Sequence, residues 1–438
     1  MQQTLTKKTK EKSLILGVFG LGYVGLPLSL TFCRAGFRVI GFDIDSKKID
    51  KLNSGESYIK HIDETGISQY VKNGLFRASC DFSELSQCDV LIVCVPTPLT
   101  PSREPDLSFV QNTTQSIAPY LRKGQLFCLE STTYPGTTEE VVRPLLEAKG
   151  LCAGKDFYLA YSPEREDPGN EDFSTNKIPK LVGGYTSECA KAAKTIYGAA
   201  FMQVVTVSSC AVAEAAKLLE NIYRSVNIAL VNELKVLLTR MKIDIWEVVN
   251  AAKTKPFGFA AFYPGPGLGG HCIPIDPFYL SWRARQFGLS TRFIELAGEV
   301  NTSMPQYVVE RIGEALNEVS KPIRGSKIFV LGLAYKKDVD DLRESPSITL
   351  IEMLQARGAS VYYNDPFFPT IPPMRDHKLS TKSRPVAQAT LADADLVLIS
   401  TDHSCYNYAL IGKYARIIVD TRNAMSDEGE CNAVIWKA

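Results

Sequence analysis

Apolar and polar positions along the N-terminal part of the chain predict strands and helices in turn. An apolar run at residues 14–19 predicts a buried strand, and apolar positions at helical spacing follow it as far as Gly36. A second strand is predicted at residues 38–42, directly before Asp43. Two later runs, "DVLIVCVPTPL" and "QLFCLESTTYPGTT", have the continuous apolar character of strands buried on both faces. Strands that alternate with helices indicate an α/β domain with a parallel sheet.

The middle and the end of the chain show two further patterns. From residue 211 to about residue 252, apolar positions recur at helical spacing without glycine or proline, which predicts long helices. Past Arg324 the strand–helix–strand pattern returns, and its second strand ends at Asp365. We therefore expect an α/β domain at residues 1–205, a helical domain at 206–318 and a second α/β domain at 319–438.

Composition and charge narrow the class of protein. The chain has 438 residues, more than one hydrophobic core usually accommodates, and its hydrophobic content of 45% is ordinary for a globular protein. Its 49 basic and 48 acidic residues give a net charge of +1, without the basic excess of a nucleic-acid or membrane-surface binder. The 11 cysteines form no C-x-x-C pair, and no apolar stretch is long enough to cross a bilayer. We expect a cytoplasmic protein.

A glycine-rich turn follows the first predicted strand and opens the first predicted helix. Its sequence GLGYVG has the G-x-G-x-x-G spacing, and Asp43 stands about 20 residues further on. Glycines let the backbone approach a pyrophosphate, whose charge a helix N-terminus attracts, while the acid binds a ribose hydroxyl and disfavours NADP. The alternative is an ordinary tight turn, but the context favours an NAD site. The residues predicted to form it are Gly20, Gly22, Tyr23, Val24, Gly25, Asp43, Pro96 and Thr97.

The stretch GPGLGGHCIPID at residues 265–276 surrounds Cys272 with glycines, and a metal site, a tight turn and a covalent catalyst are the three explanations. The metal site is disfavoured because no second pair of ligands has suitable spacing. Asp276 and Pro277 have the order of a helix N-cap and a first helical residue, so Asp276 is either a cap or a catalytic group. A helix that begins there would bring positive charge to Cys272 and lower the pKa of its thiol.

A thiol has a use in a dehydrogenase that carries an alcohol beyond the aldehyde. The first oxidation removes one hydride and needs no cysteine. A thiolate that adds to the aldehyde gives a thiohemiacetal, loss of a second hydride gives a thioester, and water releases the acid. In the C-terminal part, Lys336, Lys337 and Arg343 are cations suited to a diphosphate-bearing substrate.

Other classes of protein fit these residues less well. An epimerase or a short-chain dehydrogenase needs a Tyr-x-x-x-Lys pair, and none of the 19 tyrosines has lysine at that spacing. A dehydrogenase that removes a single hydride would leave Cys272 without a role. Lys217 and Asn221 share one face of the predicted helix, where a solvated polar stripe is the plain alternative. An NAD-binding regulator would have no use for these three residues together.

Taken together, these motifs resemble the UDP-glucose/GDP-mannose dehydrogenase family over nearly the whole chain. The motifs that carry the resemblance are GLGYVG, VPTP, ESTTYPGTT, SPERED, AAKLLEN, GPGLGGHCIPID and GLAYKKDVDDLRES. The resemblance implies two Rossmann-like doubly wound parallel-sheet domains joined by a central helical domain. It also implies homodimers built on the central helix and NAD-dependent oxidation of a sugar C6 alcohol, through the aldehyde, to a uronic acid.

The resemblance also implies roles for individual residues. Cys272 matches the nucleophile, Asp276 an acid that helps to activate water, and Glu164 an acid/base near the thioester. Thr132 matches a threonine that holds water, with Thr133 as the alternative register. The positions that match sugar and substrate contacts are Arg165, Lys217, Asn221, Lys336 and Arg343.

Two departures from the family pattern indicate the substrate. The chain reads PEREDPG where UDP-glucose enzymes usually have P-E-F-L-A/R-E-G, and it has Ile275 where they have lysine. Both changes resemble the branch that acts on UDP-N-acetylhexosamines. We expect UDP-N-acetylglucosamine as the substrate, with UDP-N-acetylmannosamine and UDP-glucose as alternatives, and a product used for surface polysaccharides such as O-antigen.

Overall fold

The computed structural model describes residues 2–59, 62, 64–100, 102–165, 177–270, 273–372, 374, 377, 379, 381–426 and 431–438. Contacts within the chain divide it into two compact units. The first unit comprises Met1–Glu220 with Phe278–Ser290, and the second comprises Asn221–Pro277 with Thr291–Ala438. Within these residues, no helix is both long and apolar enough to span a membrane.

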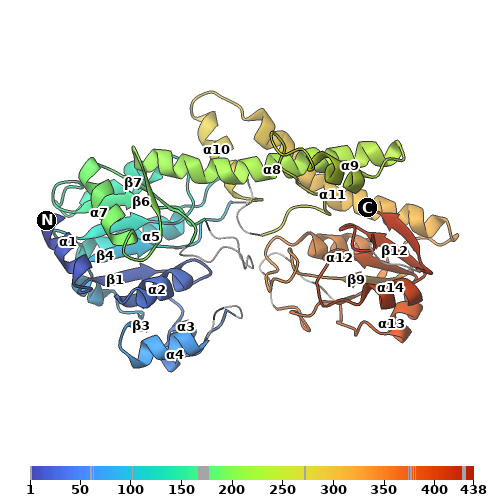
Figure 1. The fold of residues 1–438 in the computed structure, drawn as a ribbon, viewed down its shortest axis with the longest axis horizontal. Coiled ribbons are helices and arrows are strands. Elements are labelled where there is room, and N and C mark those ends of the chain that lie inside the picture. The colour runs from blue at the N-terminus through green and yellow to red at the C-terminus, as the bar shows by residue number, and fades with distance from the viewer. Residues whose placement is uncertain are drawn as a thin grey trace. The chain divides into compact units, whose positions relative to one another are not determined.

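The first unit contains a sheet of eight strands in the order β3-β2-β1-β4-β5-β6-β7-β8 (Figure 1). Neighbouring strands are parallel, except that β6 and β7 run antiparallel. The strands are β1 Ile15–Phe19, β2 Arg38–Phe42, β3 Phe76–Ser79, β4 Val90–Val93, β5 Leu126–Leu129, β6 Tyr158–Tyr161, β7 Lys180–Gly184 and β8 Val204–Val207. The predicted parallel sheet is confirmed, and β2 has the predicted bounds.

Helices connect these strands, and their ends follow local sequence signals. In α3, for example, the Asp45 side chain caps the first turn, and Gly55 ends the helix in a left-handed conformation. The helices are α1 Gln2–Lys10, α2 Gly25–Arg34, α3 Ser46–Ser54, α4 Glu64–Lys72, α5 Ser108–Ile117, α6 Arg143–Glu147 and α7 Ser187–Tyr197. The shorter helical segments are η1 Phe82–Gln87, η2 Ala118–Tyr120 and η3 Thr138–Val142.

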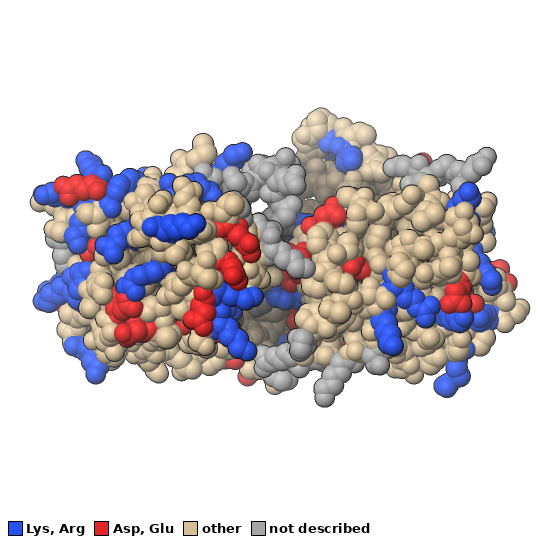
Figure 2. All heavy atoms as spheres, turned by 90° about the horizontal axis from the view of Figure 1, so that it is seen from below, with Lys and Arg blue, Asp and Glu red and all other residues tan. Residues whose placement is uncertain are grey.

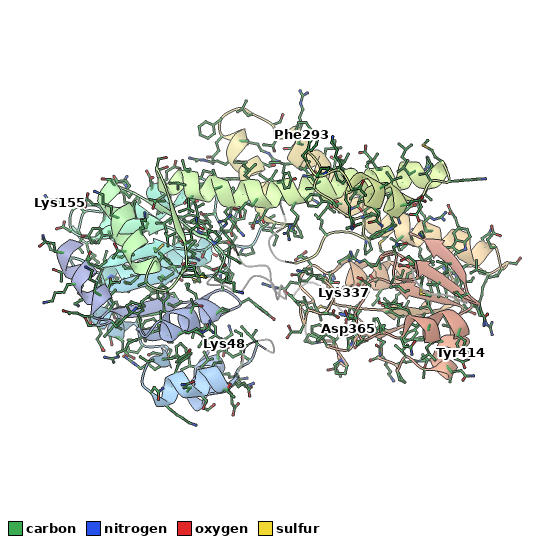
Figure 3. All side chains as sticks on the ribbon, in the orientation of Figure 1. Lys48, Lys155, Phe293, Lys337, Asp365 and Tyr414 are labelled. Carbon is green, nitrogen blue, oxygen red and sulfur yellow. The ribbon has the colours of Figure 1, made fainter. Side chains whose placement is uncertain are left out.

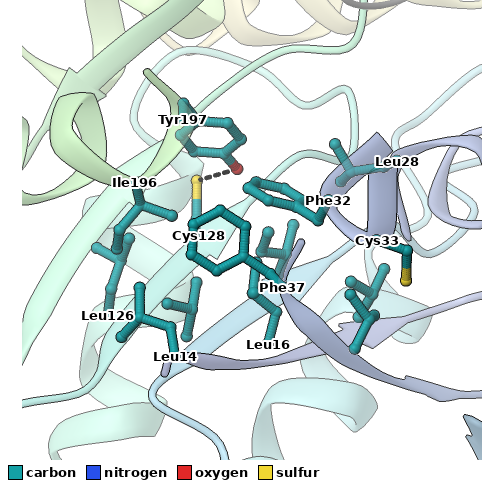
Figure 4. Packing of buried hydrophobic residues seen from close by; sticks show 14 of the residues in the cluster. Leu14, Leu16, Leu28, Phe32, Cys33, Phe37, Leu126, Cys128, Ile196 and Tyr197 are labelled. Atoms are coloured by element: carbon teal, nitrogen blue, oxygen red, sulfur yellow. Dashed lines mark hydrogen bonds between the residues drawn. The ribbon is translucent and has the colours of Figure 1, made fainter. Parts of the chain in front are cut away.

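Apolar side chains from both faces of this sheet form the core of the first unit. Figure 4 shows one side of it, where Phe32 from α2 packs near Phe37 and Tyr197. The Tyr197 hydroxyl oxygen lies 3.4 Å from the Cys128 sulfur. Burial raises the pKa of the Cys128 thiol well above its usual value, so this cysteine is an inert core residue.

The long helices follow the first sheet. They are α8 Cys210–Arg240, α9 Ile245–Ala252, α10 Asp276–Arg285 and α11 Arg292–Asn317. The predicted helical stretch is interrupted between α8 and α9, where Lys242 adopts a φ of 61°. The Asp244 side chain then caps α9 by accepting from the Trp246 amide. The stretch is therefore not one continuous helix, although it contains no glycine or proline, because Lys242 occupies the turn position.

The second unit contains a parallel sheet of five strands in the order β10-β9-β11-β12-β13 (Figure 1). The strands are β9 Lys327–Leu331, β10 Ser360–Asn364, β11 Leu396–Ile399, β12 Ile417–Asp420 and β13 Val434–Lys437. The helices that accompany them are α12 Pro346–Ala356, α13 Gln388–Asp393 and α14 Tyr408–Tyr414. Two parallel-sheet regions with a helical region between them are confirmed, while the predicted domain boundaries stay predictions.

The two sheets share a device that closes their first turn. Gly20 follows β1 with a φ of 84°, and its amide donates to the Phe42 carbonyl. Gly332 follows β9 with a φ of 85°, and its amide donates to the Asn364 carbonyl. An acid then follows the second strand in each case, and Figure 3 labels the C-terminal one, Asp365. The sequence echo between the two ends of the chain is therefore a structural repeat.

Basic and acidic side chains lie interspersed over the face shown in Figure 2. This mixture accords with the net charge of +1. A surface on which both signs alternate does not create the extended positive potential that attracts a polyanion.

Candidate active site

The glycine turn after β1 is shaped to admit a pyrophosphate. A Cβ on Gly20 would meet the Cys94 carbonyl oxygen at 2.7 Å, and one on Gly25 would meet the Gly20 oxygen at 2.0 Å. A Cβ on Gly22, in contrast, would have no atom within 4 Å. The N-cap residue of α2, Val24, offers no side-chain hydrogen bond to the first turn. The turn is thus closed on the protein side and open where a phosphate needs backbone N–H groups, so the residues fit the dinucleotide.

Asp43 lies directly after β2 and beside this turn. Its carboxylate accepts from the Leu21 amide at 3.0 Å and from the Asp45 amide at 3.0 Å. Lys48, which Figure 3 labels on α3, forms an ion pair with Asp43 at 3.5 Å. The Tyr58 hydroxyl donates to the Leu21 carbonyl from the other side. Asp43 therefore stands at the position predicted for a ribose contact and also holds the glycine turn in place.

Pro96 and Thr97 follow β4 at the same edge of the sheet. Thr97 is buried, and its carbonyl accepts from the Tyr279 hydroxyl at 2.9 Å. Because β1 and β4 are adjacent parallel strands, the residues after them converge on one edge of the sheet. The predicted cofactor residues of the first unit are thus close neighbours.

The segment after β5 carries Thr132 and Thr133. Thr132 is half-buried, whereas Thr133 is fully buried and its hydroxyl has no hydrogen-bond partner among the described residues. Glu214 of α8 fixes the segment by accepting from the amides of Gly136 at 2.6 Å and Thr138 at 2.9 Å. Both threonines consequently remain candidates for the role predicted for Thr132.

Glu164 belongs to a buried charge network that the sequence did not reveal. The Lys180 ammonium lies 2.7 Å from Glu130 and 3.1 Å from Glu164, and its side chain is only 3% exposed. The Tyr197 hydroxyl donates to Glu130 as well. Burial alone would lower the pKa of Lys180, but the two carboxylates outweigh it and the net pKa is raised. Lys180 is therefore charged and holds the Glu164 carboxylate in place.

Arg165 is tied to two neighbours. Its guanidinium pairs with Glu220 of α8 at 2.7 Å and donates to the Pro179 carbonyl at 2.8 Å. These contacts fix the direction of the side chain without using all five of its N–H donors. Arg165 thus stays a candidate substrate contact in an ordered position.

Lys217 and Asn221 lie one turn apart on α8, as predicted. The Lys217 side chain is buried. The Asn221 amide donates to the Asp276 carboxylate at 2.5 Å, and Asp276 itself is buried. Asp276 is the first residue of α10, so this helix begins one residue earlier than predicted, where Asp276 was the cap and Pro277 the first helical residue. The pairing brings together two of the predicted catalytic residues that are far apart in the sequence.

The start of the cysteine loop is anchored in the second unit by a chain of buried amides. Asn232 of α8 accepts from the Gly265 amide at 3.0 Å and donates to Asn301 of α11 at 3.0 Å. Asn301 in turn donates to the Ser225 carbonyl at 3.1 Å. Because every group in this chain is buried and paired, the loop has one defined starting position.

The glycines of the loop are required by close packing against the C-terminal part of the same unit. A Cβ on Gly269 would meet the Tyr335 Cβ at 2.4 Å, and Gly270 lies with the Tyr335 ring 3.0 Å from its Cβ position. The Gly270 amide donates to the Arg343 carbonyl at 2.8 Å. His271 and Cys272 come next in the sequence and lie outside the described residues. The segment that precedes them is therefore tightly packed as far as Gly270.

The predicted cations of the second unit flank this segment. Arg343 forms a bidentate pair with Asp341, in which Nε donates to Oδ1 at 3.0 Å and Nη2 donates to Oδ2 at 2.7 Å. Lys336 follows Tyr335 directly, and Figure 3 labels its neighbour Lys337. A further cation, which sequence reasoning missed, is Arg422: its guanidinium would lie 2.7 Å from a Cβ on Gly265. The signal that could have found it is its place just after the apolar strand β12.

A mostly parallel sheet with an open glycine turn and an acid after its second strand defines a dinucleotide-dependent enzyme of the α/β class. Comparison with known protein families identifies the kind of enzyme. The NAD binding, central and UDP binding domains of the UDP-glucose/GDP-mannose dehydrogenase family match residues 15–201, 211–303 and 329–427. The chain belongs to this family and is an NAD-dependent UDP-sugar dehydrogenase.

Individual relatives cover nearly the whole chain. The UDP-N-acetyl-D-mannosamine dehydrogenase of Pyrococcus horikoshii is 34% identical, over 94% of this chain and 96% of its own length. The UDP-N-acetyl-D-glucosamine 6-dehydrogenase of Pseudomonas aeruginosa is 33% identical, over 95% and 98% respectively. The solved structure of the Pyrococcus horikoshii enzyme has a TM-score of 0.87 at 32% identity and covers 97% of this chain and 98% of its own.

Proposed function

We propose that this chain oxidises the C6 alcohol of a UDP-N-acetylhexosamine to the uronic acid in two steps, with Cys272 as the covalent nucleophile. For each sugar, two NAD⁺ and one water are consumed, and two NADH, one carboxylate and three protons are formed. NAD, when bound, accepts one hydride in each oxidation. The product serves surface polysaccharide synthesis in the cytoplasm.

One observation carries the proposal: described residues on both sides of Cys272 are fixed to predicted substrate residues. Before it, Gly270 is bonded to Arg343 and packed on Tyr335. After it, Asp276 is bonded to Asn221 of α8. A nucleophile held between two fixed points meets its carbonyl carbon without a large loss of conformational freedom, which favours covalent catalysis.

The roles of the chain's own residues follow from their chemistry. Lys217 and Asn221 hold the sugar oxygens, and the Lys217 ammonium stabilises negative charge that develops at C6. The Cys272 thiolate adds to the aldehyde carbon, and the thiohemiacetal oxygen loses its proton as the second hydride leaves. Asp276 and Glu164 act on the water that cleaves the thioester, which returns the thiolate.

UDP-N-acetylglucosamine is the substrate that we propose within this class. The PEREDPG sequence and Ile275 depart from the UDP-glucose pattern, which supports an N-acetylated sugar. Relatives of similar identity are named for N-acetylmannosamine, N-acetylglucosamine and N-acetylgalactosaminuronic acid, so UDP-N-acetylmannosamine is the second candidate and UDP-glucose the third.

Turnover with a panel of UDP-sugars tests the proposal. We expect the highest kcat/KM with UDP-N-acetylglucosamine and two NADH for each sugar consumed. Cys272→Ser should retain the first hydride transfer and nearly lose the second, because an alkoxide forms far less readily than a thiolate near neutral pH. One NADH per sugar, or normal acid formation by Cys272→Ser, would exclude the covalent mechanism.

A further inference from the structure

A cavity in the second unit gathers positive charge at residues with no role in the proposed reaction. It lies where the end of α8, the turn before α9, α11 and the last strand β13 meet, and its volume is about 410 Å³. Its polar lining comprises Lys235, Thr239, Lys242, Asp244, Arg311 and Lys437. Four cations from four different segments thus face one carboxylate.

The single acid of the lining is already engaged. Asp244 forms an ion pair with Lys437, and it accepts from the Trp246 amide at 3.0 Å as the cap of α9. Arg311 pairs with the exposed Glu314 and stacks on the Trp436 ring, 4.6 Å from its centroid. These contacts orient the cations without neutralising the cavity.

Lys235 is the strongest indication that an anionic ligand binds in this cavity. Its side chain is only 1% exposed, and within the described chain it makes no hydrogen bond or ion pair. Asp420 and Asp244 influence it, but Asp420 accepts from the amides of Arg422 and Met425 instead. A buried ammonium without a partner is unfavourable, so an anionic partner would stabilise it.

After the Lys235 ammonium, Arg311 carries the second unsatisfied donor near the cavity. Its Nε atom is buried and has no hydrogen-bond partner among the described residues. Burial also lowers the pKa of Lys235 to about 8, in the direction expected for an amine that lacks its counter-ion. Lys235 and Arg311 therefore both line the cavity, and each carries a buried donor without a partner among the described residues.

We propose that this cavity binds a small molecule through a phosphate group, with Lys235 and Arg311 as its main partners. Phosphate offers several acceptor oxygens to donors that arrive from different directions, which suits cations on α8, α11 and β13. Thr239 adds a hydroxyl to the same lining. The bound molecule would brace α8 against α11, the two helices whose Asn232 and Asn301 anchor the cysteine loop. This site goes beyond the proposed function and does not depend on it.

Thermal unfolding of the full chain in the presence of inorganic pyrophosphate tests the site. NADH and UDP are held at saturating concentration so that the cofactor and substrate positions are occupied, and NaCl at equal ionic strength is the salt control. We expect a saturable rise in Tm with pyrophosphate that NaCl does not produce. A rise that does not saturate, or one that NaCl reproduces, would overturn the proposal.

Variants assign the effect to the cavity. Lys235→Met should abolish the saturable rise, and Lys242→Gln, at an exposed position, should weaken pyrophosphate binding by about tenfold. Lys413→Met changes a lysine of α14 that does not line the cavity, and should leave the titration unchanged. If Lys235→Met fails to fold, Lys242→Gln decides. Equal titrations for the wild type and Lys242→Gln would place the binding elsewhere.

Discussion

At the scale of single residues, Lys180 shows how a buried charge can serve both stability and chemistry. It is placed between Glu130 and Glu164 in the interior of the first unit. Its raised pKa means that its contribution to stability is complete below the unfolded value of about 10.4 and is lost only as pH rises above this value toward the folded pKa. At neutral pH the network is therefore fully formed.

We predict that Lys180→Met lowers the free energy of unfolding by about 3–5 kcal/mol, because it leaves two carboxylates without their buried cation. The double variant Glu130→Gln/Lys180→Met should recover most of this loss. Urea unfolding at pH 7 measures both. A single variant as stable as the wild type would contradict the assigned charge of Lys180.

The double variant also separates positioning from stability. Glu164 still lacks its cation there, so the acidic limb of the pH–rate profile for the second oxidation should move up by about one pH unit. Lys180→Arg, which keeps the charge, should restore the limb toward its original position. If the stable double variant has the wild-type profile, Lys180 has a structural role alone.

Replacement of Lys235 by methionine, unlike that of Lys180, is predicted to raise the free energy of unfolding. Because its folded pKa of about 8 lies below the unfolded value of about 10.4, the unfolded chain binds the extra proton between these values. Without phosphate, Lys235→Met should therefore be more stable than the wild type at pH 7, by about 3 kcal/mol. The difference should shrink as pH rises from about 8 to about 10.4. Urea unfolding in phosphate-free buffer across this range measures it, and a constant difference would count against the buried charged amine.

At the scale of elements, the turn between β1 and α2 allows a matched comparison of two glycines. Gly22→Ala should fold normally, because its Cβ meets no atom within 4 Å, and should bind NADH at least about tenfold more weakly. Gly25→Ala should instead lose about 1–3 kcal/mol of stability, because its Cβ overlaps the Gly20 oxygen. Chemical unfolding and NADH fluorescence titration distinguish the two effects. Normal NADH binding by Gly22→Ala would show that the pyrophosphate lies elsewhere.

The helix α8 carries an apolar stripe that this chain alone leaves exposed. Tyr223, Leu230 and Leu237 recur every seven residues and are each more than half exposed. We propose that they form the homodimer interface, since the removal of such a stripe from water favours association. Leu230→Glu/Leu237→Glu should convert a dimer to a monomer in light scattering at micromolar concentration. Val319→Glu, at a similarly exposed apolar position, should remain dimeric.

Sequence periodicity predicted the central strands of both sheets well because these strands are buried and continuously apolar. The resemblance to a family implied separate roles for Asn221 and Asp276, whereas the hydrogen bond between them was not predicted. Periodicity could not predict the Glu130–Lys180–Glu164 network, because Lys180 opens an apolar strand where a lysine is normally solvent-facing. The turn at Lys242 was not predicted either, because no glycine or proline marks it in the sequence.

At the scale of the whole molecule, the two sheets bind different ligands. The NAD binding domain of the family matches residues 15–201 and the UDP binding domain matches residues 329–427, in different compact units. We predict that NADH and UDP stabilise the chain additively, each by about 2.7 kcal/mol at one hundred times its Kd. At the same NADH concentration, Gly22→Ala should reduce the NADH contribution to about 1.4 kcal/mol or less and keep that of UDP in calorimetry. Loss of both contributions would mean that the two ligands share one site.

The repeated turn has a practical consequence for any attempt to change the cofactor preference of this enzyme from NAD to NADP. In the C-terminal repeat, Asp365 accepts from the Leu333 amide at 2.7 Å and lies 3.1 Å from Nε2 of the buried His403. Asp43 makes the equivalent bond to Leu21. In both copies the acid thus accepts from a backbone amide of the turn and stabilises the turn, whether or not it also contacts a ribose. Replacing Asp43 to admit NADP would also remove the hydrogen bond that it accepts from the Leu21 amide. A successful redesign must therefore supply a new acceptor for this amide.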